Sequence, residues 1–437
     1  MDLLIAFLVF LAALIVSLVK GISVTYVLVL GLALFLGVGM RRGFSLPELG
    51  KMSWVGVRKS LIVIEVMCVI GFITAIWRVS GTITIFVYYG MKVITPPLFL
   101  EIAFVLSCIL SYALGTSFGV AGTVGVIFMT LARSGGVDPV LTAGVLMSGV
   151  YFGDRCSPVS SSANMVAGVT ETKIMDNVRI MMKTGMVPLI ICLLIYGVIS
   201  FLHPISSVDE ALMAEFESSF NLSLWAFVPA VLMLVLPLLK VDLMLCMFLS
   251  IGSGALVAWL VQGVPLLEIL KTSIFGYQAA DEGLGSILNG GGLLSMLEVV
   301  IILIISCMYS GIFDGTDMLR SVQERITAAC ARFGRFAVMI ILSFLSAMLF
   351  CNQTIATLMC NDLLQKPYLE AGGSKEELAI DMENSVILIA CSIPWAIGCA
   401  VPLSFFGVGP KAMLYAFFMY LVPIYYLFAK KRWYKDK

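Results

Sequence analysis

The sequence predicts an all-α, polytopic membrane protein, and three observations support this prediction. Of 437 residues, 60% are hydrophobic and 12% are charged, against about 25% charged in an ordinary soluble domain. Long apolar stretches such as 3–19, 186–202 and 293–313 approach or reach the roughly 20 residues that cross a bilayer. Two other apolar regions are interrupted by glycine, proline and hydroxyl residues, which indicates broken helices at membrane depth.

About ten transmembrane helices are expected. In chain order they lie near 3–19, 22–40, 60–77, 139–153, 186–202, 223–239, 242–261, 293–313, 384–401 and 412–428. Two further apolar stretches, near 97–132 and 336–365, are expected to enter the membrane and return without crossing it, as two re-entrant hairpins. With this count, both ends of the chain lie on the same side of the membrane.

The distribution of basic residues predicts the orientation. Basic clusters lie at 41–59, at 320–335 and at the end of the chain, 430–437. The positive-inside rule puts these clusters, and therefore both termini, in the cytoplasm. The loop 203–220 contains four acids and no Lys or Arg, which fits the opposite side. We expect a multi-pass protein of the cell inner (plasma) membrane.

An internal repeat defines the expected domains. The segment LSYALGTS at 110–117 aligns with LSAMLFCN at 345–352. By the charge rule the span 60–77 runs outward and the span 293–313 runs inward, so we expect two inverted-topology repeats, as in many secondary transporters. The expected units are an N-terminal helical hairpin with a basic cytoplasmic loop (1–59), the first repeat (60–202), a connecting loop with linker helices (203–292), the second repeat (293–428) and a basic cytoplasmic tail (429–437).

Composition and motifs exclude several classes of function. The 27 basic and 27 acidic residues balance, so nothing indicates a nucleic-acid partner. The sequence has no Walker-type motif, no CxxC pair and no Cys/His cluster at metal spacing. We therefore expect no cofactor, no enzyme active site and no ATP-driven pump. The expected partners are the lipid bilayer and a small ion or solute, with a homodimer as a candidate assembly.

The first interruption is GTSFGVAGTVG at 115–125, with four glycines and three hydroxyls. Irregular backbone at membrane depth is tolerated where it lines a cavity or is buried in protein. We expect a re-entrant hairpin in which Thr116, Ser117 and Thr123 offer oxygen ligands to a hard ion such as Na⁺. The alternative is close helix packing through small residues.

The second interruption, 153–164, is the richest polar cluster in the sequence. Pro158 removes a helical hydrogen bond and Gly153 loosens the chain, which predicts an unwound span. The candidate binding residues here are Asp154, Ser157, Ser160, Ser161 and Asn164. A Na⁺ site is expected at Asp154, Ser161 and Asn164. The alternative is a cytoplasmic helix end with a capping side chain.

Proton transfer is expected at carboxylates, because the single histidine, His203, lies at a span end next to a proline. Acids within spans are costly and are functional candidates by default. Asp154 is the leading proton carrier, and Glu65, Glu298 and Glu383 are the other candidates. Glu65 and Glu298 can equally be interfacial, since each is expected near a membrane face.

The run LGTSFGVAGTVGV…GVYFGDRCSPVSSSAN, from 114 to 164, resembles the NhaC-type sodium/proton antiporters of the ion transporter superfamily. Those proteins carry LGTSFGTxGTxG and GD[KR]xSPLSDTTN. In the second half, the order of basic loop, hairpin and Ile-Pro-Trp also agrees, which implies that Asn352, Gln353 and Pro394 belong to the site. The chain departs from the family pattern at Ser161, Asn352 and Asn384, where the family usually has Asp.

The resemblance implies a secondary active transporter that exchanges Na⁺ for H⁺ by alternating access. Amides and hydroxyls ligate Na⁺ but do not titrate, so the missing acids favour an alternative. This is a sodium- or proton-coupled transporter or exchanger of a small organic solute, a carboxylate or an amino acid, on the same fold. It would bind the solute carboxylate at the serine-rich break and at half-helix N-termini. A passive channel or a scaffold is the third class.

Overall fold

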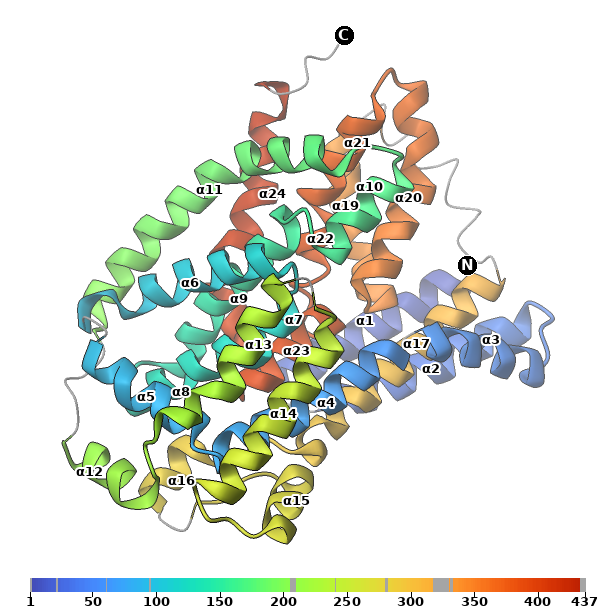
Figure 1. The fold of residues 1–437 in the computed structure, drawn as a ribbon. Coiled ribbons are helices and arrows are strands. Elements are labelled where there is room, and N and C mark those ends of the chain that lie inside the picture. The colour runs from blue at the N-terminus through green and yellow to red at the C-terminus, as the bar shows by residue number, and fades with distance from the viewer. Residues whose placement is uncertain are drawn as a thin grey trace.

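The computed structural model describes residues 2–20, 23–59, 61–93, 96–204, 210–239, 241–279, 282–316, 330 and 333–432. Within these residues the fold is helical and contains no β-strand (Figure 1). Tyr277 pairs with Gly290 in an isolated bridge. The all-α prediction is therefore confirmed for the part of the chain that the structure describes.

The N-terminal helices are α1 (Asp2–Lys20), α2 (Val24–Arg41), α3 (Leu46–Lys59), α4 (Leu61–Val79) and α5 (Thr82–Val93). The helix α3 lies within the segment expected to be a basic loop. It begins with a capping box, in which the backbone N–H of Ser45 donates to Glu48 Oε2 at 2.8 Å. It packs against α17 (Leu297–Thr316), and a Cβ added to Gly56 would lie 2.9 Å from Gly311 N. Glycine thus permits this close helix crossing.

The remaining described helices lie between residues 96 and 432. Residues 96–202 form η1 (Pro96–Leu98), α6 (Phe99–Leu114), α7 (Ser117–Val120), the π-helical turn η2 (Ala121–Gly125), α8 (Val126–Ser134), α9 (Pro139–Cys156), α10 (Ser161–Val169) and α11 (Ile174–Leu202). The connecting region forms α12 (Glu210–Ser219), η3 (Leu224–Phe227), α13 (Val228–Leu238), α14 (Leu243–Leu260), α15 (Leu266–Phe275) and α16 (Glu282–Leu288). After η4 (Leu293–Met296) and α17 come α19 (Arg335–Phe350), α20 (Gln353–Glu370), α21 (Lys375–Glu383), α22 (Val386–Ile389), α23 (Ile397–Phe406), η6 (Pro410–Tyr415), α24 (Phe417–Ala429) and η7 (Lys430–Arg432).

Several helices are long and apolar enough to span a bilayer. Within the described residues, four meet this criterion alone: Ser117–Ser134, Ile174–Leu202, Leu243–Leu260 and Leu293–Phe313. Two bent pairs, Ile64–Val79 with Thr82–Gly90 and Met213–Ser219 with Leu224–Pro237, raise the number to six if each pair is one span. Shorter apolar helices, such as Phe417–Ala429, accompany them. The chain is a multi-pass membrane protein built from helices.

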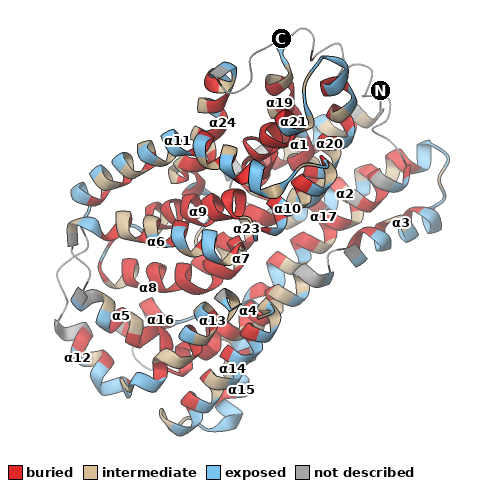
Figure 2. Cartoon of the chain, turned by 45° about the horizontal axis from the view of Figure 1, so that its top comes forward, coloured by how far each residue is buried: buried red, intermediate tan, exposed pale blue. Residues whose placement is uncertain are grey.

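The helix α9 is the central element. Residues 141–156 are all buried (Figure 2), because α9 packs against α6, η6 and α24 (Figure 1). The helix starts where its sequence predicts: Pro139 is its first residue and Asp138 caps it, accepting a hydrogen bond from Val140 N at 2.8 Å. A polar side chain at its other end must therefore find partners within the protein.

Two stretches of the chain repeat the same order of helix starts at a constant separation. The helices α17, α19 and α23 begin 236 positions after α4, α6 and α10 respectively. The capping residues Asp138 of α9 and Ser374 of α21 have the same separation. The segments 110–117 and 345–352, which align by residue type, are 235 positions apart. The helix starts therefore match in a register that differs by one residue from the sequence alignment.

A buried ionic cluster joins η7, which follows α24, to α19, α20 and α21. Lys430 Nζ lies 2.7 Å from Glu377 Oε1 and 2.5 Å from Asp381 Oδ2. Arg335 Nη2 lies 3.0 Å from Glu377 Oε1, and the Tyr368 hydroxyl donates to Asp381 Oδ2 at 2.7 Å. Because Asp381 is fully buried, its charge depends on these partners. The cluster holds Lys430 against the helix that leads to Glu383.

Candidate functional site

The two helical hairpins turn at residues with the same backbone conformation. Gly115 (φ +64°) follows α6 and Cys351 (φ +53°) follows α19, both in the left-handed region. The next residues cap the following helices: Thr116 Oγ1 accepts from Gly119 N at 3.2 Å, and Asn352 Oδ1 accepts from Thr354 N at 2.9 Å. The polar residues at both tips thus satisfy backbone N–H groups that begin a helix inside the protein.

Each hairpin tip lies against the helix break of its own half. Residues 157–160, which separate α9 from α10, pass so close to Gly115 that an added Cβ would be 2.7 Å from the Val159 carbonyl carbon. In the second half, the backbone N–H of Ile397, the first residue of α23, donates to the Cys351 carbonyl at 2.8 Å. The interruption predicted around Pro158 is present, and it is in direct contact with the first hairpin.

The halves also contact each other across the centre. The side chain of Gln353, at the second hairpin, donates from Nε2 to Asp154 Oδ2 at 3.1 Å and to the Ile387 carbonyl at 3.0 Å. The Tyr151 hydroxyl, one turn before Asp154 on α9, donates to the Gly398 carbonyl in α23. These contacts bring a hairpin tip and both helix breaks together at the C-terminal end of α9.

Asp154 lies at this meeting point and is only 4% exposed. The Ser160 hydroxyl donates to its Oδ1 at 3.3 Å, and the Ser162 hydroxyl donates to its backbone carbonyl at 2.9 Å. The two serine hydroxyls lie 2.8 Å apart. Among the described residues no group of three or more His, Cys, Asp or Glu side chains could hold a metal ion. The cluster therefore offers one carboxylate and neutral oxygens, a set that suits a monovalent cation as cargo better than a resident transition metal.

Glu383 provides a second buried carboxylate near Asp154. It is the last residue of α21 and is fully buried. Neither of its carboxylate oxygens has a hydrogen-bond partner within the described part of the chain. It lies within electrostatic range of Arg155 and Asp154. A buried carboxylate without a partner is costly when ionised, so this position needs a proton or a compensating positive charge.

The other expected binding residues near the break differ in their exposure. Ser161 and Asn164 are exposed, and Asn164 Nδ2 donates to the Pro158 and Ser160 carbonyls at 2.9 and 2.7 Å. Their side chains therefore do not join Asp154 in one cluster, where the neighbouring Ser160 and Ser162 lie instead. The Ser157 hydroxyl, which is buried, accepts from Val159 N at 3.2 Å.

The first hairpin contributes unequally to this region. Thr123 Oγ1 donates to the Gly119 carbonyl at 2.6 Å inside its own helix, which satisfies the hydroxyl locally. Thr116 caps α7, as described above. Ser117 is buried and lies beside the Tyr151 hydroxyl. Pro394, in the second break, is half-buried.

Two of the four candidate proton carriers lie outside the site. Glu65 on α4 is exposed, and so is Glu298 on α17, which accepts a hydrogen bond from the Ser23 hydroxyl at 2.9 Å. Asp154 and Glu383 are the two that are buried. Burial thus distinguishes Asp154 and Glu383 from Glu65 and Glu298 as candidate proton carriers.

Sequence reasoning placed Arg155 beside Asp154 but did not include Arg155 or Ser162 among the candidate site residues. Arg155 is fully buried and donates from Nη2 to Thr184 Oγ1 at 2.9 Å, to the Met181 carbonyl at 3.1 Å and to Asn384 Oδ1. The signals in the sequence were its position next to Asp154 and its match to the Lys/Arg position of the motif GD[KR]xSPLSDTTN. Its partners lie on α11 and after α21, so no local pattern could reveal them.

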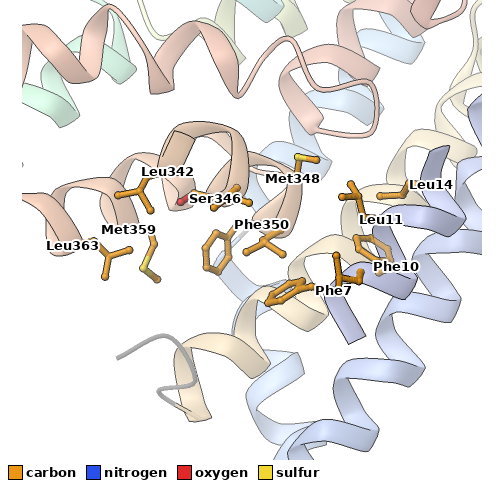
Figure 3. Close-up of a pocket in the computed structure, with 13 residues that line it drawn as sticks. Phe7, Phe10, Leu11, Leu14, Leu342, Ser346, Met348, Phe350, Met359 and Leu363 are labelled. Atoms are coloured by element: carbon orange, nitrogen blue, oxygen red, sulfur yellow. The ribbon is translucent and has the colours of Figure 1, made fainter. Parts of the chain in front are cut away.

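A separate cavity of about 290 Å³ lies between α1, α19 and α20 (Figure 3). Its lining includes Phe7 and Phe10 of α1 and Leu342 and Phe350 of α19, and Ser346 is the polar side chain in it. None of the expected binding residues lines it. Because ions need several oxygen ligands, this apolar cavity is not the ion site.

An all-helical membrane chain in which broken helices from two halves meet around buried carboxylates defines a secondary transporter. Residues 149–430 match the family model described as the Na⁺/H⁺ antiporter family. The chain belongs to this family, and the resemblance seen in its motifs is confirmed.

Curated relatives cover most of the chain. The malate-2H⁺/Na⁺-lactate antiporter of Bacillus subtilis (strain 168) is 25% identical over 393 residues, 87% of this chain and 84% of the relative. The Na⁺/H⁺ antiporter NhaC of Alkalihalophilus pseudofirmus is 24% identical over 375 residues, covering 84% and 81%. The arginine/ornithine antiporter ArcD of Halobacterium salinarum is 26% identical over 387 residues, covering 84% and 79%.

Proposed function

We propose that the chain is a sodium-coupled antiporter that exchanges Na⁺ for H⁺ by alternating access. The observation that carries this proposal is the environment of Asp154: a buried carboxylate, beside Ser160 and Ser162, that Gln353 from the other half contacts at 3.1 Å. A cation and a proton compete for one negative charge, and neutral oxygens complete the coordination of the cation. The family of the chain supports the same reaction.

The buried charges favour a cation as cargo. Asp154 and Glu383 contribute two negative charges when ionised, and Arg155 contributes one positive charge. The remaining negative charge attracts Na⁺ or a proton in a region screened from water. Glu383, whose oxygens have no partner among the described residues, is the second candidate proton carrier.

The proposed architecture consists of about ten crossings and two re-entrant hairpins in two inverted repeats, 60–202 and 293–428. It is supported by the constant separation of 236 positions between helix starts in the two halves and by the basic clusters that predict cytoplasmic termini. Units 1–59, 203–292 and 429–437 complete the proposed organisation. Exchange by rocking one part of such a fold against another needs no ATP-binding domain. The plasma membrane is the proposed location.

The experiment is sodium-driven proton movement in proteoliposomes that enclose a pH-sensitive dye. Wild-type protein should move protons when Na⁺ is added, and Asp154→Asn should fall to the level of protein-free liposomes, because an amide carries neither the charge nor the proton. Asp138→Asn is the matched control, since Asp138 is exposed at the other end of α9 and Asn caps a helix as well as Asp. Wild-type rates in Asp154→Asn would overturn the role of Asp154.

A second candidate function is exchange of a small carboxylate or amino acid. It is favoured by Ser161, Asn352 and Asn384, where the resemblance implies Asp, and by relatives named as malate/lactate and arginine/ornithine antiporters. The excess of buried negative charge speaks against an anionic cargo. Transport of radiolabelled malate, lactate and arginine in the same liposomes distinguishes the two candidate functions. Exchange of one of these solutes without sodium-driven proton movement would replace the first proposal.

A further inference from the structure

Two arginines without an acidic partner lie within electrostatic range of each other, outside the exchange site. Arg78 is the next-to-last residue of α4 and is only 5% exposed, and Arg133 is the next-to-last residue of α8 and is partly exposed. Among the described residues no acid pairs with either of them. Because a guanidinium keeps its charge in proteins, this region contains two positive charges that repel each other.

The hydrogen bonds of these arginines leave this positive charge uncompensated. Arg78 Nη1 donates to the Thr74 carbonyl at 2.6 Å, one turn earlier in its own helix, and its buried Nε has no hydrogen-bond partner in the described part of the chain. Arg133 Nη2 donates to the Phe406 carbonyl at 2.6 Å and lies 3.5 Å from the Gly407 carbonyl oxygen. Carbonyl oxygens are acceptors without net charge. A small anion would supply both the missing acceptor and the missing negative charge.

A purely structural role accounts for only part of this arrangement. Both arginines lie in the last turn of a helix, where the helix dipole favours a positive charge. The charge equivalent to a helix C-terminus is only about half a unit, so each guanidinium keeps net positive charge. A structural role also does not require two arginines in range of each other or a buried Nε without an acceptor.

Contacts on both sides of Arg78 hold this end of α4 in place. Trp77 Nε1 donates to Ser250 Oγ on α14 at 2.9 Å, and Gln262 Nε2, after α14, donates to the Ser80 carbonyl at 3.1 Å. A charged group that is fixed in advance loses little conformational entropy when a ligand binds. The position of Arg78 therefore suits a binding site.

Arg133 gives the pair access to the surface of the protein. Gly407, beside it, is exposed and has φ +64°. A Cβ added to Gly407 would lie 2.9 Å from Arg133 Nη2, and its nearest atoms would all belong to Arg133. The glycine thus leaves the guanidinium uncovered on this side.

The arginine pair lies far from the proposed exchange site. Arg133 precedes Asp138, the capping residue at the start of α9, by five positions, whereas Asp154 follows Asp138 by 16 positions. At 1.5 Å per residue, this separates Asp154 from the start of α9 by about 24 Å. A ligand of the arginine pair would therefore not contact Asp154.

We propose that Arg78 and Arg133 form a binding site for a small carboxylate near the start of α9. The planar fork of a guanidinium matches the two oxygens of a carboxylate, and a carboxylate between the two arginines would accept hydrogen bonds from both. Its negative charge would remove their repulsion. The burial of Arg78 restricts the ligand to a molecule of the size of acetate or lactate. The proposal does not depend on Na⁺/H⁺ exchange, because binding is a property of the folded chain.

The first experiment measures the binding of radiolabelled lactate to the purified protein in detergent by equilibrium dialysis. The wild type should bind lactate saturably. Arg78→Gln and Arg133→Gln should each raise the Kd about tenfold or more, because each removes a charged hydrogen-bond donor to the carboxylate. Arg179→Gln, which removes an exposed arginine from α11, should leave the Kd unchanged. Absence of saturable binding in the wild type, or an unchanged Kd in either variant of the pair, would overturn the proposal.

Arg78→Lys separates the shape of the guanidinium from its charge. It keeps the positive charge but lacks the planar fork, so its Kd should rise less than that of Arg78→Gln; an equal or larger rise would contradict the electrostatic argument. Thermal unfolding in detergent establishes that each variant is folded before binding is measured. If Arg78→Gln does not fold, an unchanged Kd in Arg133→Gln still overturns the proposal.

Competition with unlabelled anions tests the chemistry of the ligand. Acetate should displace lactate, because both present a carboxylate to the arginines. Chloride cannot make two parallel hydrogen bonds to a guanidinium, so about tenfold more chloride than acetate should be needed for the same displacement. Equal displacement by the two anions would show a general anion site and would overturn the assignment to carboxylates.

Discussion

Gly115→Ala is expected to disturb the site through backbone contact alone. Gly115 combines a left-handed conformation, φ +64°, with close contact to the first helix break. An added Cβ would lie 2.7 Å from the Val159 carbonyl carbon and 2.8 Å from Ser160 N. These are backbone atoms, so no side-chain rotation can relieve the overlap. Ser160, whose hydroxyl donates to Asp154, would have to move with the break.

The expected cost has two parts. A side chain in the left-handed region costs about 1–2 kcal/mol. Ordinary contact begins at 3.4 Å, so the break must shift by about 0.7 Å, and overpacking of this kind costs about 1–3 kcal/mol. The total is about 2–5 kcal/mol. Gly372→Ala is the matched control, because Gly372 has φ +75° and open space around its Cβ position, so that only the first part applies.

The assay compares thermal unfolding in detergent with the KM for Na⁺ in proteoliposomes. The unfolding midpoints should fall in the order wild type, Gly372→Ala, Gly115→Ala, and only Gly115→Ala should change the KM, since only it displaces Ser160. Equal midpoints for the two alanine variants would refute the argument from close contact. An unchanged KM in Gly115→Ala would show that the break can move without affecting the ion.

Two further predictions concern buried charges. Lys430→Met should destabilise the protein by about 3 kcal/mol or more, because it leaves the buried carboxylate of Asp381 without its cation, while Glu377 keeps Arg335. Lys431→Met, at an exposed neighbour, should leave the unfolding midpoint unchanged, and equal midpoints in both variants would contradict this. Gln353→Ala removes the amide that donates to Asp154. The KM for Na⁺ at constant pH should rise about tenfold, because a hydrogen bond to a charged group contributes about 1.5–3 kcal/mol. Thr354→Ala, at the exposed next residue, serves as the control, and a KM that does not rise in Gln353→Ala would count against a role for this contact.

The sequence predicted the helical fold and the positions of its interruptions because both follow from local chemistry. Apolar stretches specify spanning helices, and glycine, proline and hydroxyl residues specify where a helix can stop inside the protein. The break at 157–160 lies where Pro158 indicated it. The helix α3 was missed because its charged residues matched a basic loop, whereas the capping box at Ser45 and Glu48 and the contact at Gly56 favour a packed helix.

Which side chains surround Asp154 depends on the exact start of α10, which the amino-acid sequence does not show. Ser160 caps α10 and faces Asp154, whereas Ser161 is the first residue of that helix and is exposed. A change of one position in the helix start would exchange these two serines, since successive helical residues point in different directions. Arg155 finds its partners on α11 and after α21, at long sequence separations that no local pattern encodes.

The departures from the family motif remove charge but retain hydrogen bonds. Asn352 accepts from the N–H groups of Thr354 and Ile355, as an Asp cap would, and Asn384 binds Arg155 through its amide oxygen. An amide in either position keeps the backbone and the guanidinium in place while adding no negative charge to a region screened from water. Under the proposed function, ion exchange in this chain depends on the two remaining carboxylates, Asp154 and Glu383. The neutral residues that first argued against ion exchange are therefore compatible with it, because they maintain the geometry around those two acids.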